Sequence, residues 1–260
     1  MANTAIRKLQ AGTPTGGTAG QALVKNSGTD FDYDWGTGGS VVVTNVSIIE
    51  DFLFSTQVIE GGVGTDVDYR EFSYSYWYTN ADPGSQMVSV FSEQNHAGII
   101  EFDGVLVNDE RLIAFSNQAG GATPTDGGIP VDNDFEVEIL TRNTYNVSAN
   151  THEARYHLIS ASETLDVTVN ADSVNNNISY TLFTTTGTTT IPASATWFKI
   201  KWVYTSGTIE LYIDGVLIDS EVGTFGANDG GYVMVNGSQT GAGTIDIALD
   251  YILLNYTLTR

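Results

Sequence analysis

The fold of this chain is decided by residues 197–218, which read WFKIKWVYTSGTIELYIDGVLI. Within residues 197–204 bulky apolar side chains alternate with positions that include two lysines, and residues 208–213 repeat the alternation. A period of two is typical of β-strands that bury one face. The letters TSG supply a turn between the two runs, and Asp214-Gly215 is a signal for a type I′ hairpin. The stretch therefore predicts a three-stranded antiparallel meander.

From residue 41 onward the chain shows the same pattern as this meander, with short runs in which apolar and polar residues alternate. Gly, Asn, Asp and Thr clusters separate short alternating runs at the spacing expected of a β-sandwich. The runs are residues 71–78, 135–140, 156–159, 165–169, 178–183, 216–222, 232–235 and 245–256. No window of about 12 residues has the 3.6-residue period of a helix. We therefore predict an all-β chain, with a sandwich domain over residues 41–260 and an N-terminal arm and linker over residues 1–40.

The meander resembles the concanavalin-A-like (laminin-G-like) jelly-roll superfamily, in which a W-[YF]-x-[LI]-x-[WI] strand pairs with a V-x-[LF]-Y-[VI]-[DN]-G strand. Residues 245–254, IDIALDYILL, are similar to the closing strand of that superfamily. Residues 50–53, EDFL, and residues 95–100, NHAGII, are similar to an opening and a turn of its phage members, with Ala97 in place of proline. The resemblance implies a concanavalin-A-like jelly-roll β-sandwich preceded by an extended arm.

Residues 1–40 differ in composition, because they are rich in Gly and Thr and have few bulky apolar groups to bury. Residues 16–35, GGTAGQALVKNSGTDFDYDW, resemble an element of tail-fibre and head-fibre proteins of tailed bacteriophages. In those proteins the element lies near the attachment end of trimeric fibres. The resemblance implies that this arm attaches the chain to a virus particle. The candidate attachment residues are Gly16, Gly17, Gly20, Leu23, Phe31 and Trp35.

Charge divides the chain at nearly the same place. Residues 1–29 hold three basic and no acidic residues (+3), whereas the remaining 231 residues hold seven basic and 31 acidic residues (−24). The net charge of −21 disfavours binding to nucleic acid or anionic lipid. The sequence has no signal peptide, no apolar run long enough to span a membrane and no cysteine. We therefore expect no membrane insertion and synthesis in the host cytoplasm, and the resemblance of the arm to phage fibre proteins implies a place in the virion.

Glu136 and Glu138 form the one carboxylate pair with the spacing of a jelly-roll glycosidase. The two residues stand two apart in FEVEI, residues 135–139, so they share one face of a strand. Jelly-roll glycosidases place a nucleophile and an acid in this way, usually in an E-x-D-x-E pattern. Because the central Asp is missing here, we interpret the pair as a solvated strand face. We expect no catalytic residue and no enzyme activity.

Metal and cofactor signals are weak. The three histidines lack metal-ligand spacing, and turn or surface positions are expected for them. Asp66, Asp68 and residues 132–134, DND, carry oxygen atoms that calcium could use, but no complete calcium loop is present. Ordinary turn chemistry is the preferred interpretation. The histidines are His96, His152 and His157.

Aromatic residues offer no readable glycan site. Tyr74, Tyr76 and Tyr78 share a strand face, and exposed rings of this kind can stack on sugars, although core or subunit packing is preferred. We expect a virion structural protein (a head fibre, capsid decoration or tail fibre) that docks onto major capsid or tail proteins. It forms a homotrimer and projects a lectin-like domain toward host-surface glycans. Two alternatives stay open: a polysaccharide depolymerase using Glu136 and Glu138, and a dedicated receptor-binding lectin at the tail tip.

Overall fold

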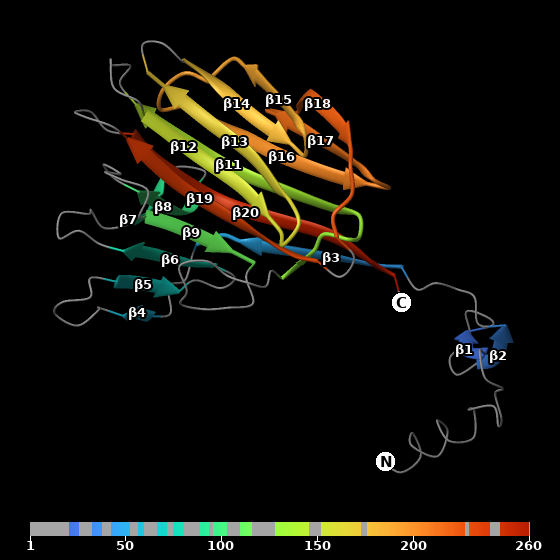
Figure 1. Cartoon of the computed structure of the whole chain (residues 1–260). Helices are drawn as coiled ribbons and strands as arrows, with labels where there is room; N and C mark the ends of the chain where they lie inside the picture. The colour runs from blue at the N-terminus through green and yellow to red at the C-terminus, as the bar shows by residue number, and fades with distance from the viewer. Residues whose placement is uncertain are drawn as a thin grey trace. The chain divides into compact units, whose positions relative to one another are not determined.

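A computed structural model describes the backbone of most of the chain (Figure 1). The described residues are 21–25, 33–37, 43–52, 57–59, 67–71, 75–80, 89–93, 96–102, 110–115, 128–145, 152–172, 176–226, 229–239 and 245–259. They contain β-strands and turns but no helix, so none of them forms a helix that could cross a bilayer. The chain divides into two compact units, Met1–Thr44 with Thr259–Arg260, and Asn45–Leu258.

The described part of the first unit is a two-stranded antiparallel sheet. Strand β1 (Gln21–Lys25) pairs with β2 (Tyr33–Thr37). The register sets Leu23 opposite Trp35. The backbones of these two residues therefore lie directly opposite each other in the sheet.

The second unit consists of two antiparallel sheets. The order of the ten-stranded sheet is β15 (Thr185–Thr189), β14 (Asn176–Leu182), β13 (Thr164–Ala171), β12 (His152–Ile159), β19 (Gly230–Gln239), β9 (Glu110–Ala114), β6 (Ser75–Asn80), β5 (Val67–Glu71) and β4 (Gln57–Ile59), with β10 (Ile129–Pro130) pairing β19. The order of the eight-stranded sheet is β18 (Val216–Val222), β17 (Thr208–Ile213), β16 (Trp197–Thr205), β11 (Phe135–Tyr145), β20 (Ile245–Thr259), β8 (His96–Phe102) and β7 (Ser89–Glu93), with β3 (Val43–Glu50) pairing β20.

The core lies between the two sheets. Strand β11 alternates buried and half-buried residues along most of its length, and β12 and β16 do the same. Trp202 and Tyr156, one from each sheet, are the largest side chains that are fully buried. The apolar positions that alternate in the sequence thus fill one continuous interior. The all-β jelly-roll sandwich predicted from the sequence is confirmed.

The predicted meander is present as β16, β17 and β18. Asp214 and Gly215 both have positive φ, at 50° and 77°, which is the backbone signature of a type I′ turn. Ser206 and Gly207 form a second two-residue turn of the same kind, with φ of 51° and 83°. The alternation is regular along β16 and β17, whereas the pairing of β17 with β18 shifts register between Leu211 and Tyr212.

Two details of the strand prediction are wrong. Residues 71–78 were expected to form one run, but β5 ends at Glu71 and β6 begins at Ser75, and these two strands pair with each other. Strand β15 was not expected, because its sequence TTGTT contains no apolar residue. It is an edge strand, so it has a neighbour on one side only.

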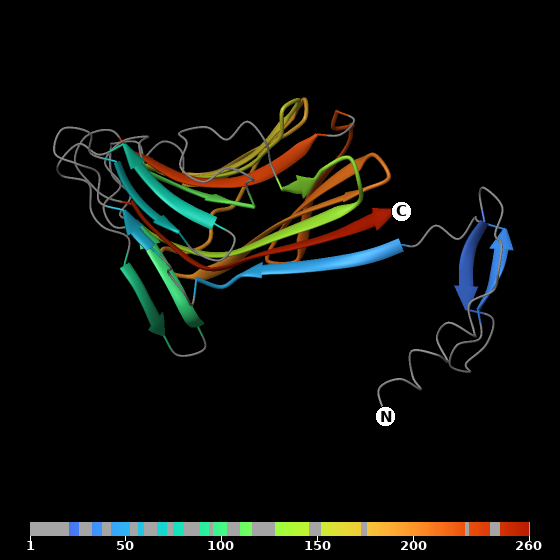
Figure 2. The same cartoon turned by 90° about the horizontal axis from the view of Figure 1, so that it is seen from below.

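The two sheets are stacked and curved in the same sense (Figure 2). The outer face of the ten-stranded sheet is concave and is called the hollow side below. The outer face of the eight-stranded sheet is convex and is called the bulging side. The sandwich therefore presents two outer surfaces of different shape.

Candidate functional site

Strand β12 divides its side chains between the core and the hollow side. Every second residue from Ala154 to Leu158 is buried in the core. Glu153, Arg155 and His157 alternate with them and so point outward. The outward side chains of β12, β13, β14, β15 and β19 are together called the β12 face below.

His157 lies at the centre of the β12 face, between two neighbouring strands. Its Nε2 is hydrogen-bonded to Asn236 Oδ1 of β19 at 3.1 Å. Its Nδ1 lies 3.0 Å from Asp166 Oδ1 of β13 without hydrogen-bond alignment, and this contact is an ion pair only when the imidazole is protonated. Thr168 Oγ1 donates to the other oxygen, Asp166 Oδ2, at 3.0 Å. The imidazole, the carboxylate and the amide thus hold one another in fixed positions across three strands.

The cation of this face is already paired. Arg155 Nε donates to Glu153 Oε2 at 2.8 Å, and Arg155 Nη2 contacts the same oxygen. The side chains are 34% and 19% exposed, so the pair is only partly covered. Because Glu153 takes up the guanidinium charge, Arg155 is not a free anion site.

Uncharged polar groups cover the remainder of the β12 face. Asn170 Nδ2 donates to Asn177 Oδ1 at 3.1 Å and to Ser179 Oγ at 3.0 Å. A surface hollow of about 450 Å³ lies beside Asp166, and its lining includes the hydroxyls of Ser179 and Thr181 from β14 and of Thr186 and Thr188 from β15. A carboxylate and several hydroxyl groups therefore line one open depression, and the amide of Asn170 lies beside it through its bond to Ser179.

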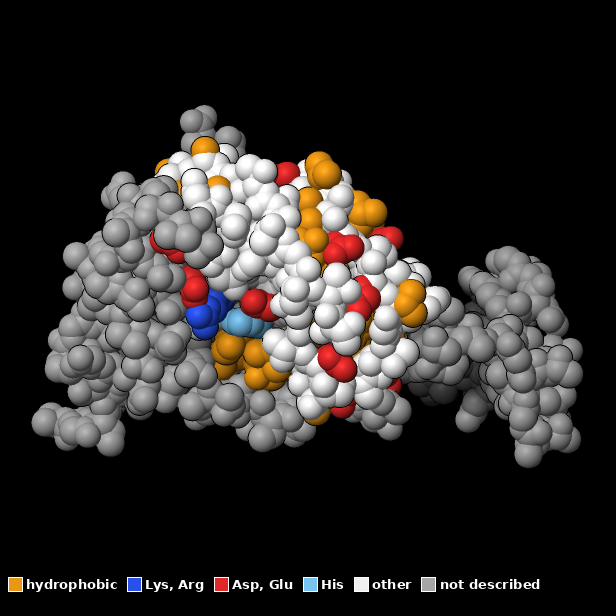
Figure 3. Space-filling view, turned by 45° about the horizontal axis from the view of Figure 1, so that its top comes forward, with side chains coloured by type: hydrophobic (Ala, Val, Ile, Leu, Met, Phe, Trp, Pro, Cys, Tyr) orange, Lys and Arg blue, Asp and Glu red, His pale blue; other side chains and the backbone are white. Residues whose placement is uncertain are grey.

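A small apolar cluster borders these polar groups. Ile113 and Tyr232 are buried in it, with Ile159 and Met234 half-buried beside them. Met234 is the register partner of His157, so the cluster adjoins the polar centre. Figure 3 looks onto this side of the molecule, where a basic and a histidine side chain lie next to acidic ones, with hydrophobic side chains close by.

The carboxylate pair predicted as a solvated face lies on the bulging side. Glu138 is only 15% exposed, and it accepts hydrogen bonds from Lys199 Nζ at 2.8 Å and from Tyr251 OH at 2.5 Å. Burial alone would raise the pKa of Glu138, but the bonds from Lys199 and Tyr251 outweigh it and lower that pKa. Glu136 lies 3.5 Å from Lys201. The two glutamates do share a face, but as members of an ion-pair ladder.

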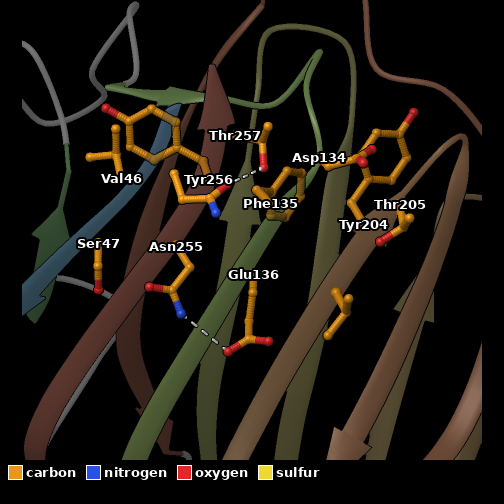
Figure 4. Close-up of a pocket in the computed structure, with 12 residues that line it drawn as sticks. Val46, Ser47, Asp134, Phe135, Glu136, Tyr204, Thr205, Asn255, Tyr256 and Thr257 are labelled. Atoms are coloured by element: carbon orange, nitrogen blue, oxygen red, sulfur yellow. Dashed lines mark hydrogen bonds between the residues drawn. The ribbon is translucent and has the colours of Figure 1, made fainter. Parts of the chain in front are cut away.

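A second depression, of about 460 Å³, lies at the end of this ladder (Figure 4). Glu136 and Asn255 line it, and Asn255 Nδ2 donates to Glu136 Oε1 at 3.4 Å. Glu138 does not line it. The depression therefore does not bring the two carboxylates together in one cleft.

Aromatic rings on the bulging side are covered by cations or by another ring. Lys201 Nζ lies 5.1 Å from the ring centre of Tyr212, and Arg142 lies 4.9 Å from that of Trp197. His96 stacks on Trp197 at 4.4 Å. These rings are engaged within the protein. Tyr74 lies outside the described residues, and of Tyr76 and Tyr78 only the backbone is described.

Turn positions for the histidines were wrong, because all three lie in strands. A surface position was wrong for His152, which is fully buried. His96 Nδ1 is 2.8 Å from Asp250 Oδ2, so ring stacking and a carboxylate together hold this imidazole in the sheet. Local spacing could not reveal these partners, because Asp250 is 154 residues away in the chain.

The possible calcium ligands are occupied in turn contacts where they are described. Asn133 Nδ2 donates to Asp132 Oδ1, and Asp134 Oδ1 accepts a hydrogen bond from the backbone N–H of Ser206. Asp66 lies outside the described residues, and of Asp68 only the backbone is described. Within the described side chains, no group of three or more His, Cys, Asp or Glu residues could hold a metal ion.

The predicted attachment residues are described only in part. Gly16, Gly17, Gly20 and Phe31 lie outside the described residues. Leu23 and Trp35 are register partners in the sheet of β1 and β2. Their pairing does not test whether the arm attaches to a particle.

Comparisons with known proteins identify the fold and nothing finer. No family model matches the chain, and no curated protein matches it. An endo-β-1,3-glucanase from Pyrococcus furiosus is 12% identical, with a TM-score of 0.45 over 79% of this chain and 100% of that one. An alginate lyase of polysaccharide lyase family 7 is 12% identical, with a TM-score of 0.47 over 68% and 86%. A botulinum neurotoxin type C structure is 14% identical, with a TM-score of 0.47 over 77% of this chain but only 47% of its own.

The structure itself shows an all-β sandwich of two antiparallel sheets among the described residues. The expectation that the chain has no enzyme activity is corrected at this point, because solved structures that resemble it include a glucanase and an alginate lyase. The absence of an E-x-D-x-E pattern argues only against one arrangement of catalytic carboxylates. A jelly-roll fold does not by itself exclude catalysis.

Proposed function

We propose that this chain is a structural protein of a bacteriophage virion, and that its jelly roll binds host-surface glycans through the β12 face. The observation that carries the binding role is the depression on the hollow side of the sandwich that Asp166 and a row of hydroxyl groups line, with His157 beside Asp166. Sugar-binding sites need several fixed donors and acceptors in a concave surface. The bulging side offers mostly groups that are already paired with one another.

The attachment role rests on the arm. The resemblance of residues 16–35 to the fibre element of tailed phages supports docking onto major capsid or tail proteins. A homotrimer would join three arms at one attachment point and give avidity to weak glycan contacts. The charge contrast between the basic arm and the acidic remainder also supports a division into two roles.

The binding role is tested with the full chain on an array of bacterial and neutral plant polysaccharides. His157→Ala is expected to weaken binding about tenfold, because Asp166 and Asn236 lose the group that positions them. Glu136→Gln, on the bulging side, is the matched control and is expected to bind as the unchanged chain does. Equal loss in both variants would contradict a site on the β12 face. Release of soluble oligosaccharide in the same mixtures would indicate the depolymerase alternative.

The attachment role is tested by deletion of residues 1–35 in the phage genome. Purified particles are expected to lack the truncated chain, whereas the chain with Glu136→Gln is incorporated at the normal level. The measurement is the amount of the chain per particle by quantitative mass spectrometry. Particles that still carry the truncated chain would show that the arm is not the anchor.

A further inference from the structure

The hollow beside Asp166 has a charge pattern that favours one class of sugar. Strands β14 and β15 supply its hydroxyl lining, and their sequences NNISYTL and TTGTT contain no Lys, Arg, His, Asp or Glu. Asp166 is the one charged residue that lines the hollow. A ligand in this position therefore meets a single negative charge among neutral hydroxyls.

The Asp166 carboxylate is held by neighbouring side chains, but part of it is accessible to solvent. Its Oδ1 is buried against His157 Nδ1, and its Oδ2 accepts the hydroxyl of Thr168. The side chain is still 28% exposed. A carboxylate has about four lone-pair sites, so Oδ2 can accept a further hydrogen bond. Sugar hydroxyls are donors of this kind.

The charges around the hollow do not offset Asp166. Arg155 is held by Glu153. An acidic group lies at the β14–β15 turn, where Glu221 accepts hydrogen bonds from Thr184 Oγ1 at 2.7 Å and Thr185 N at 3.0 Å. The whole chain carries −21. A carboxylate or sulfate group on a sugar would face this negative field without a free cation among the described side chains of the hollow.

We propose that the hollow beside Asp166 takes an uncharged sugar unit, whose hydroxyls donate to Asp166 and bond with the Ser and Thr hydroxyls, and that it rejects acidic sugars. This inference rests on the proposed glycan-binding function and adds its substrate class. It differs from that function because it names Asp166 as the group that discriminates between neutral and acidic glycans.

The test compares two sets of immobilised glycans with the full chain: neutral gluco-, galacto- and manno-oligosaccharides, and uronate- or sialate-containing oligosaccharides of the same length. The unchanged chain is expected to bind at least one neutral glycan at least tenfold more tightly than any acidic one. Asp166→Asn is expected to weaken neutral binding about tenfold, because a hydrogen bond to a charged acceptor is lost, and to reduce the discrimination against acidic glycans. Glu136→Gln is the matched charge-removal control on the other sheet.

A second variant covers the case in which Asp166→Asn does not fold. The double substitution Thr181→Val and Thr186→Val removes two hydroxyls of the hollow and keeps side-chain volume. The affinity of this double variant for neutral glycans is expected to fall several-fold, while its melting temperature stays unchanged.

The outcomes separate the two proposals. Binding only to acidic glycans, or neutral binding that neither variant weakens, overturns this inference and leaves the glycan-binding function standing. No binding to any glycan of either set overturns both. Neutral binding that Asp166→Asn weakens and Glu136→Gln leaves unchanged supports the inference.

Discussion

Polar residues on the two outer surfaces differ in how many of their hydrogen-bonding sites are already occupied by other groups of the protein. On the bulging side Glu138 bonds both Lys199 and Tyr251, and Lys199 also lies 5.7 Å from the ring centre of Tyr251. On the hollow side Asp166 contacts His157 and Thr168 but keeps an exposed fraction of 28% beside an open depression. A fixed but incompletely used acceptor is the feature that a ligand can exploit.

The ion pair of Glu138 makes a prediction about pH. Its pKa is lowered in the folded chain from the ordinary value of 4.5, so its stabilising contribution is present above about that pH and is lost as pH falls through the folded pKa. At pH 7 Glu138→Gln is expected to cost about 1 kcal/mol or less, because Lys199 is 45% exposed and water screens the pair. Thermal unfolding followed by circular dichroism measures the difference.

Removal of the other partner, Lys199, gives the control for that prediction. Lys199→Met is expected to lower the melting temperature at pH 7 as Glu138→Gln does, since each removes one partner of the bond. The difference between the unchanged chain and Glu138→Gln is expected to shrink between pH 5 and pH 3. A difference that stays constant over this range would mean that the charge of Glu138 contributes nothing to stability.

At the scale of elements, local patterns were sufficient for the strands and insufficient for their partners. Residues 197–218 gave the meander and the Asp214-Gly215 turn, because alternation and turn chemistry act between near neighbours. Strand β15 was not predicted, because its sequence has no apolar residue. A sequence pattern reports burial, and a polar edge strand buries little.

The candidate site was not predictable for a different reason. His157 and Asn236 are 79 residues apart, and β19 reaches β12 only through the topology of the sheet. The spacing E-x-R-x-H in β12 places Glu153, Arg155 and His157 on one face, and this was the available signal. This spacing matches neither a pair of catalytic carboxylates nor a set of metal ligands, so the sequence alone did not single it out. The hollow side itself follows from sheet curvature, which no local pattern reports.

At the scale of the whole sandwich, charge is distributed unevenly over the two outer surfaces. Of the four basic side chains that the structure describes, Arg142, Lys199 and Lys201 lie on the bulging side, each beside a glutamate. The β12 face has Arg155 alone, and Glu153 pairs with it. The bulging side thus neutralises itself, whereas the hollow side combines neutral hydroxyls with one acceptor charge.

Hydroxyl-radical footprinting with mass spectrometry measures directly which of these surfaces holds a glycan. Each surface carries its own reporters: Met234 and His157 on the β12 face, and Trp197 and Tyr212 on the bulging side. With a neutral oligosaccharide bound to the full chain, we predict that oxidation of Met234 and His157 falls while that of Trp197 and Tyr212 is unchanged. Protection of Trp197 and Tyr212 instead, with Met234 and His157 unaffected, would contradict the proposed binding face.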